Sequence, residues 1–254
     1  MQRYFVPESG WEDNQIIITG EDAHHINRVM RLKAGDQVIC NHPEGYAAVC
    51  EIISSSPSEV HTKVLEQMEE NKELPIDVII AQGLPKGDKI DYIIQKGTEL
   101  GAHSYLPFQA ERSIVVWDDK KKKKKITRLN KIAKEASEQS HRNKIPYIYP
   151  VMSMADLLEE TKAYDLKIFA YEEEAKTGNH QSLGTILKKI SQNQYRRLIL
   201  CIGPEGGFSQ NEANLLKEHD FHSVRLGPRI LRTETASLYA LASISYHFEE
   251  LGCK

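Results

Sequence analysis

From residue 76 to residue 250 the chain alternates short apolar runs with longer amphipathic stretches, and this alternation limits the folds that it can adopt. The runs are almost continuously apolar, which is typical of strands covered on both faces of a sheet. Strands that alternate with helices predict a parallel sheet with helices on both sides, an α/β fold. The expected strands are 76–81, 104–108, 147–149, 166–171, 197–202 and 223–226. The expected helices are 88–100, 125–140, 154–160, 182–190, 210–218 and 235–250.

The first 70 residues have a different pattern, with several short strands and little helix. Strands are expected at 15–19, 37–41, 47–53 and 59–66, and a short helix at 21–31. The turn His42-Pro43-Glu44-Gly45 lies between two of these strands and is typical of a β-hairpin. Such a series of strands predicts a small β-barrel. The polar stretch 69–75, which ends in proline, divides the chain into domains at 1–70 and 74–254.

Composition is that of an ordinary globular protein. At 254 residues the chain is long enough for one large or two modest domains. It contains no run of 18 apolar residues, so no membrane-spanning helix is expected. Its cysteines, which form no C-x-x-C pair, favour free thiols in the cytoplasm over disulfides or a metal site. They are Cys40, Cys50, Cys201 and Cys253.

The net charge of −3 is not the strongly basic balance typical of nucleic-acid-binding proteins, but the basic charge is unevenly distributed. Six of the 33 basic residues are consecutive, Lys120 to Lys125, whereas 36 acidic residues are spread along the chain. The lysine run is either the solvated start of a helix or a local concentration of positive charge. The sequence leaves both interpretations open.

Two loops rich in glycine and proline follow apolar strands near the carboxyl end. The first, Gly203-Pro204-Glu205-Gly206-Gly207, precedes Ser209 and Glu212, whose spacing predicts a capping box at the start of a helix. The second loop covers 226–232. Glycine lacks the Cβ atom that would keep a ligand from the backbone, so both loops are candidate ligand sites. Neither has the spacing of a Walker A or a G-x-G-x-x-G motif.

These residues carry a family resemblance. The first loop, followed by Leu226-Gly227-Pro228-Arg229-Ile230-Leu231-Arg232-Thr233-Glu234-Thr235-Ala236, resembles the RsmE family of 16S rRNA uracil-N3 methyltransferases. Residues 3–6 and 24–32 have the same resemblance. It implies a PUA-like RNA-binding barrel followed by a SPOUT-type sheet with a carboxy-terminal trefoil knot. It also implies the cofactor S-adenosylmethionine, a homodimer, and 16S rRNA as substrate, within the small ribosomal subunit or a late precursor. The expected cofactor-binding residues are Gly203, Pro204, Glu205, Gly206, Gly207, Leu226, Gly227, Ile230, Leu231 and Arg232.

Arg232 and Glu234 are the candidate catalytic residues. Methylation at N3 of uracil requires loss of the N3 proton, and negative charge develops on the O2 and O4 atoms. A carboxylate that takes or positions this proton and a cation that stabilises the charge would both accelerate transfer. Glu234 and Arg232 suit these two roles. The structural alternative is an acidic residue favoured by the helix dipole beside a surface arginine.

The resemblance implies that five arginines contact RNA, and guanidinium groups are suited to binding phosphate. Ordinary structural or surface arginines are the alternative at each position. The five are Arg3, Arg28, Arg31, Arg112 and Arg142.

The resemblance thus implies a cytoplasmic enzyme that methylates N3 of a specific uridine in 16S rRNA. Two alternatives remain open. One is an RNA-binding protein without catalytic activity, and the other is a SPOUT methyltransferase that acts on tRNA. A hydrolase is the weakest option because the chain lacks a G-x-S-x-G nucleophile elbow.

Overall fold

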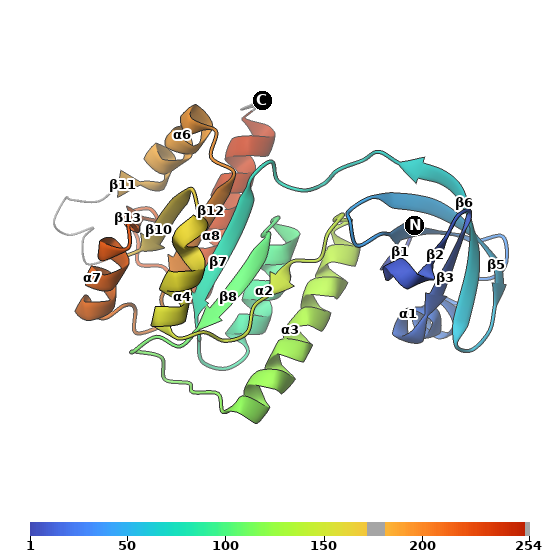
Figure 1. Cartoon of the computed structure of the whole chain (residues 1–254), viewed down its shortest axis with the longest axis horizontal. Helices are drawn as coiled ribbons and strands as arrows, with labels where there is room; N and C mark the ends of the chain where they lie inside the picture. The colour runs from blue at the N-terminus through green and yellow to red at the C-terminus, as the bar shows by residue number, and fades with distance from the viewer. Residues whose placement is uncertain (172–180, 252–254) are drawn as a thin grey trace. The chain divides into compact units, whose positions relative to one another are not determined.

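A computed structural model describes residues 1–171 and 181–251 of the chain (Figure 1). The chain forms two compact units. Unit 1 consists of Met1–Glu73 together with Ser137–Ile145, and unit 2 consists of 74–136 and the residues from Pro146 onward. The short segment Ser137–Ile145 therefore joins the amino-terminal unit although it is far from it in sequence.

Unit 2 is built on a seven-stranded sheet in the order β11-β13-β10-β12-β7-β8-β9. Every pairing in this sheet is parallel, which confirms the α/β architecture expected from the alternating pattern. Only β11 was not among the expected strands. The strands are β7 (Asp77–Gly83), β8 (Ser104–Phe108), β9 (Tyr147–Ile148), β10 (Leu166–Ala170), β11 (Gln181–Ser182), β12 (Arg197–Ile202) and β13 (His222–Arg225).

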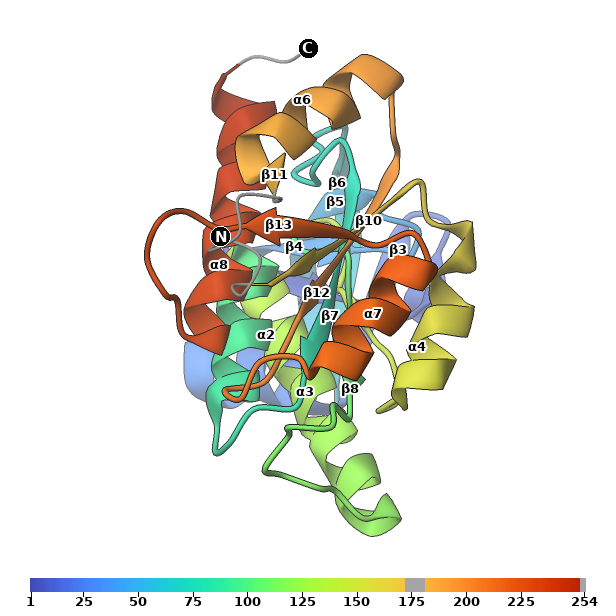
Figure 2. The same cartoon turned by 90° about the vertical axis from the view of Figure 1, so that its left-hand side faces the viewer.

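Helices cover both faces of this sheet because the side chains of each strand point alternately to opposite sides. In β7, Val78 and Ile80 belong to a core with residues of α2, α3, α6 and α8, while Ile79 and Ala81 belong to a second core with α4 and α7. Figure 2 shows α4 and α7 on one side of the sheet and α2, α6 and α8 on the other. The trefoil knot stays a prediction. The helices are α2 (Lys89–Glu99), α3 (Asp119–Gln139), α4 (Met154–Glu160), α6 (Leu183–Asn193), α7 (Gln210–Glu218) and α8 (Thr233–Ser245).

Helix α3 begins six residues earlier than expected and includes the whole lysine run. The Asp118 side chain accepts a hydrogen bond from the Lys121 backbone N–H at 2.8 Å, which satisfies one of the free amides of the first turn. Lysine is a good helix former, so the run can continue the helix once this cap is in place.

Unit 1 contains a six-stranded sheet in the order β1-β4-β5-β6-β3-β2. Strand β1 pairs in parallel with β4 and the remaining neighbours are antiparallel. The expected helix at 21–31 is the short α1 (Gly20–His24) followed by a π-helical turn that Arg31 ends with a φ of 55°. The strands are β1 (Arg3–Phe5), β2 (Trp11–Glu12), β3 (Gln15–Thr19), β4 (Gln37–Asn41), β5 (Ala47–Ser55) and β6 (Glu59–Met68).

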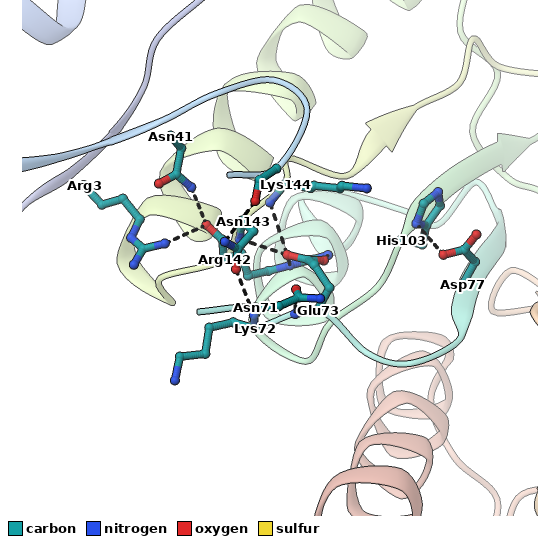
Figure 3. Close-up of polar contacts among 11 residues, drawn as sticks. Arg3, Asn41, Asn71, Lys72, Glu73, Asp77, His103, Arg142, Asn143 and Lys144 are labelled. Carbon is teal, nitrogen blue, oxygen red and sulfur yellow. Dashed lines mark hydrogen bonds and ion pairs between the residues drawn. The ribbon is translucent and has the colours of Figure 1, made fainter. Parts of the chain in front are cut away.

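A polar network holds Ser137–Ile145 within unit 1 (Figure 3). The Glu73 carboxylate accepts hydrogen bonds from the Arg142 guanidinium and from the backbone amides of Asn143 and Lys144. The Arg142 carbonyl in turn accepts hydrogen bonds from the side chains of Arg3 and Asn41. We call Arg3, Asn41, Glu73, Arg142 and Asn143 the clasp. The clasp links Glu73, at the end of the first part of unit 1, and residues of β1 and β4 to the segment Ser137–Ile145, where the chain returns to this unit.

Three cysteines, Cys40, Cys50 and Cys201, are free and buried, and Cys253 lies outside the described residues. None of the helices formed by the described residues is both long and apolar enough to cross a membrane.

Candidate active site

The loops that carry the candidate residues follow strands of unit 2 at one edge of its sheet. In a parallel sheet all carboxyl ends lie at the same edge, where ligands of open α/β folds bind. Strand β7 lies between β12 and β8, so the loops 84–88, 109–118 and 203–209 leave neighbouring strands. Figure 2 shows these loops together at the lower end of the sheet.

Gln82, at the end of β7, joins the first glycine loop to the start of α8. Its side-chain amide donates a hydrogen bond to Thr233 Oγ1 at 2.9 Å, and Thr233 Oγ1 donates to the Gly203 carbonyl at 2.7 Å. Ser237 Oγ donates to Gln82 Oε1 at 2.6 Å. All three side chains are buried, so the network fixes Gly203 relative to α8. Sequence reasoning missed Gln82, although a polar amide that ends an apolar strand is a usable signal.

The glycines of the first loop meet two different requirements. A Cβ atom at Gly206 would lie 2.9 Å from Arg112 Cβ, closer than such atoms approach, so this glycine allows the turn at 110–113 to pack on the loop. The Arg112 guanidinium donates a hydrogen bond to the Gly206 carbonyl at 3.3 Å. Gly207 has a φ of 65°, and a Cβ there would meet nothing within 4 Å. Its backbone therefore needs glycine for conformation and faces open space.

The end of the same loop is tied to the residues that follow β8. Ser209 and Glu212 form a capping box at the start of α7, as the sequence predicts. Ser209 Oγ also donates a hydrogen bond to the Glu111 carboxylate at 2.6 Å, and Glu212 accepts one from the Glu111 backbone N–H at 2.8 Å. The turn at 110–113 is thus part of the same rigid loop assembly as Gly203–Gly207.

Lys89 bridges the two glutamates of the candidate site, and we call Lys89, Glu205 and Glu234 the acid–lysine cluster. Lys89 Nζ lies 2.7 Å from Glu205 Oε1 and 3.4 Å from Glu234 Oε2. Glu205 also accepts a hydrogen bond from the Lys86 backbone N–H at 3.1 Å. Glu234 Oε2 is buried and, among the described residues, has only the ion pair to Lys89, without hydrogen-bond geometry. A carboxylate oxygen thus faces the cluster with unused capacity to accept a hydrogen bond.

Electrostatics in the cluster favour the charged forms of both partners. The hydrogen bond to Glu205 raises the pKa of Lys89 above its ordinary value. Burial opposes this shift, and the charge of Glu205 and the contact with Glu234 add to it. Partial burial pushes the pKa of Glu205 upward, but hydrogen bonds from Lys89 and from backbone amides outweigh it, so the net shift is downward. Sequence reasoning missed Lys89, which is 116 residues from Glu205.

The remaining candidate cofactor residues lie in and beside the second loop. Leu226 is buried, Leu231 packs against the core, and Gly227 has a φ of 82°. Ile230 is 77% exposed, which is exceptional for an isoleucine. Arg232 occupies the N-cap position of α8 with an exposed side chain, and Glu234 lies in the first turn. Arg232 therefore points its charge into solvent at the same loop edge.

The five arginines expected to contact RNA fall into two groups. Arg28, Arg31 and Arg112 are exposed. Arg3 and Arg142 are each only 3% exposed and belong to the clasp, where Glu73 already neutralises Arg142. This placement does not support phosphate contacts for Arg3 and Arg142, because neither guanidinium is presented at the surface. Both side chains instead form hydrogen bonds within unit 1.

The described residues also include no group of three or more histidine, cysteine, aspartate or glutamate side chains placed to hold a metal ion.

Comparison with known proteins assigns the family. Residues 72–245 match the RNA methyltransferase domain, and residues 18–65 match the RNA methyltransferase PUA domain. The chain is 49% identical to ribosomal RNA small subunit methyltransferase E of Bacillus subtilis strain 168, covering 99% of this chain and 98% of the relative. The chain belongs to the RsmE family.

Solved structures give the same assignment for the fold. A crystal structure of a hypothetical protein is 48% identical, with a TM-score of 0.89, and covers 98% of this chain and 100% of its own. A ribosomal RNA small subunit methyltransferase E from Neisseria gonorrhoeae, bound to S-adenosyl methionine, is 27% identical. Its TM-score is 0.84, and the match covers 96% of each chain. The PUA-like domain and the SPOUT-type parallel sheet implied by the sequence resemblance are therefore confirmed.

Proposed function

We propose that this protein is an S-adenosylmethionine-dependent methyltransferase that modifies N3 of a specific uridine in 16S rRNA. One observation is the main support for this proposal. Hydrogen bonds through Gln82 and Thr233 connect the Gly203–Gly207 loop to the start of α8. This joining brings the glycine loop, Arg232 and Glu234 to one edge of the sheet. Family membership supplies the substrate, since the relatives are named for the small-subunit ribosomal RNA.

The residues present fit the cofactor. The first loop offers backbone groups beside Gly207, where open space replaces a side chain, and Leu226, Gly227, Ile230 and Leu231 offer a second, partly apolar loop. The carboxylates of Glu205 and Glu234 suit a cationic ligand. When bound, S-adenosylmethionine supplies an electrophilic methyl group on a positively charged sulfur. No residue of this chain then needs to act as a nucleophile, and positioning and proton removal are its tasks.

Glu234 and Arg232 divide the chemistry of the uracil ring between them. The partly buried Glu234 carboxylate, with an oxygen that accepts no hydrogen bond, takes the N3 proton or holds the group that does. Lys89 keeps this carboxylate in place from the side of Glu205. The exposed Arg232 guanidinium stabilises the negative charge that develops on O2 and O4.

RNA binding is divided between the two units. Arg28 and Arg31 contact phosphates from unit 1, and Arg112 contacts RNA from the loop after β8. The chain works as a homodimer in the cytoplasm, on the small ribosomal subunit or a late precursor of it. The family resemblance supports these statements.

Mass spectrometry of 16S rRNA tests the proposal. RNA from cells that lack this protein should have lost a methyl group from one uridine, and the purified protein with S-adenosylmethionine should restore it. A methyl group missing from a tRNA, with 16S rRNA unchanged, would assign the protein to the tRNA alternative. A complete set of modifications in both RNAs would contradict enzymatic function.

A further inference from the structure

The first two turns of α3 carry a concentration of positive charge that the mechanism above does not use. Lys122 lies 3.5 Å from Asp119, and Lys125 lies 3.9 Å from Asp88. The other four are exposed, and their ammonium groups make no ion pair or hydrogen bond with any residue that the structure describes. We call these four the lysine surface: Lys120, Lys121, Lys123 and Lys124.

The lysine surface is electrostatically unfavourable in the free protein for two reasons. The amino-terminal end of a helix carries the positive end of the helix dipole, which disfavours cations there. Lys120 also lies three and four residues from Lys123 and Lys124, so like charges face one another on the same side of the helix. A polyanion would relieve both effects at once. A charged surface that only interacts with solvent would require neither six consecutive lysines nor their position at the start of a helix.

The lysine surface is connected to the candidate active site within unit 2. The neighbouring Lys125 pairs with Asp88, which directly precedes Lys89 of the acid–lysine cluster. The loop that leads from β8 to α3 carries Arg112, which is bonded to Gly206. Figures 1 and 2 both show the start of α3 beyond the end of the sheet at which β7 and β8 finish.

We propose that the lysine surface binds the phosphate backbone of the RNA substrate beside the target uridine. This inference rests on the proposed function, which makes RNA the polyanion that reaches this edge of the sheet. Lysine carries a compact charge on a flexible stem, so it attracts phosphates without reading sequence. The remaining 27 basic residues are outnumbered by 36 acidic ones, so the lysine surface concentrates the attraction at one place.

The test compares the triple variant Lys120→Gln, Lys123→Gln, Lys124→Gln with wild type. A control variant removes the same number of exposed lysines from other helical segments of unit 2: Lys162→Gln, Lys188→Gln, Lys217→Gln. Binding to full-length 16S rRNA is measured over a range of salt concentrations. The triple variant should bind about tenfold more weakly at low salt, and the slope of log K against log salt should fall by about 2, roughly 0.7 for each phosphate that is no longer neutralised by a lysine. The control should match wild type.

The possible results distinguish failure of this inference from failure of the proposed methyltransferase function. Calorimetry should give the triple variant an unchanged affinity for S-adenosylhomocysteine, and its methylation should show a raised KM with kcat preserved. An unchanged RNA affinity and salt slope would overturn the inference, as would a loss of kcat with RNA binding intact. Displacement of the RNA by polyglutamate as readily as by polyuridylate would assign the surface to an acidic protein and also overturn it. Failure of wild type to methylate 16S rRNA would instead refute the proposed function.

Discussion

The Glu73–Arg142 pair of the clasp and the acid–lysine cluster in unit 2 are both ion pairs, but they differ in how fully their carboxylates are hydrogen-bonded. Elsewhere in the clasp, Arg3 Nε and Asn41 Oδ1 are buried without a hydrogen-bond partner among the described residues. In the clasp, the Arg142 side chain is 4% exposed and the Glu73 carboxylate accepts hydrogen bonds from the guanidinium and two backbone amides. In the cluster, Lys89 is 30% exposed and the buried oxygen of Glu234 accepts no hydrogen bond. A saturated, buried pair is suited to holding segments together, whereas an unsaturated one keeps capacity for a substrate.

This contrast predicts which charges are structural and which act in catalysis. Breaking a buried pair leaves an uncompensated charge and costs stability. Removing a charge from the partly exposed cluster costs little stability, so its loss should appear in catalysis. The two regions therefore predict opposite responses to the same kind of substitution.

The largest effect is expected in the clasp. Glu73→Ala should lower the free energy of unfolding of unit 1 by about 3 kcal/mol, because it leaves Arg142 buried without its partner. Urea denaturation followed by fluorescence measures this in a Trp117→Phe background, where Trp11 is the remaining tryptophan. Lys144→Ala, which removes an exposed cation from the same segment, is the control and should change stability by no more than about 0.5 kcal/mol. Equal stability of the two variants would remove the distinction between the clasp and an ordinary surface pair.

The next largest effect is expected at the start of α8. Glu234→Gln and Arg232→Ala should each slow methyl transfer at least about a hundredfold, or roughly 2.7 kcal/mol, the usual scale for one acid–base or charge-stabilising group. Single-turnover rates on small-subunit RNA, with melting curves and calorimetry of cofactor binding, measure this. A structural role of Glu234 would instead cost roughly 0.3–1 kcal/mol of stability through the helix dipole and leave the rate intact. Near-normal turnover in both variants would leave positioning of the base as the main mechanism.

A smaller effect should distinguish the two glycines of the first loop. Gly206→Ala places a Cβ atom 2.9 Å from Arg112 Cβ, so the loop must move away from the turn at 110–113. Gly207→Ala creates no contact but is strained at a φ of 65°, by about 1 kcal/mol. Both variants should bind S-adenosylhomocysteine several-fold more weakly in calorimetry. If Arg112→Gly restores affinity to Gly206→Ala but not to Gly207→Ala, loop packing is the cause at Gly206. Restoration of neither variant would indicate that position 206 contacts the ligand directly.

Much of the fold was predictable from local sequence, and the charge networks were not. The parallel sheet of unit 2 follows from apolar runs and helical spacing, and the capping box of Ser209 and Glu212 from a four-residue pattern. Arg142 and Glu73 are 69 residues apart, so no local pattern distinguishes this buried pair from an exposed arginine that binds RNA. The same holds for Lys89 and Glu205. The family resemblance located Arg232 and Glu234, but only the three-dimensional structure brings Lys89 between the glutamates.

The smallest effect concerns the pKa of Glu205. Because its folded pKa is lowered, the ionised carboxylate contributes stability that is present above the unfolded pKa and is lost as pH falls through the folded pKa. Both groups are partly exposed, so this contribution is only a few tenths of a kcal/mol, about what a surface ion pair provides. Lys89→Met should raise the pKa of Glu205 toward its ordinary value, as measured by carbon NMR of the side-chain carboxyl group during an acid titration. Lys86→Met is the matched control, because Lys86 reaches Glu205 only through its backbone N–H. The lowering of the Glu205 pKa should also become smaller in wild type as salt is added. If the pKa of Glu205 were equal in all three proteins, backbone hydrogen bonds alone would account for its lowering. Lys89 would then act electrostatically on Glu234 only.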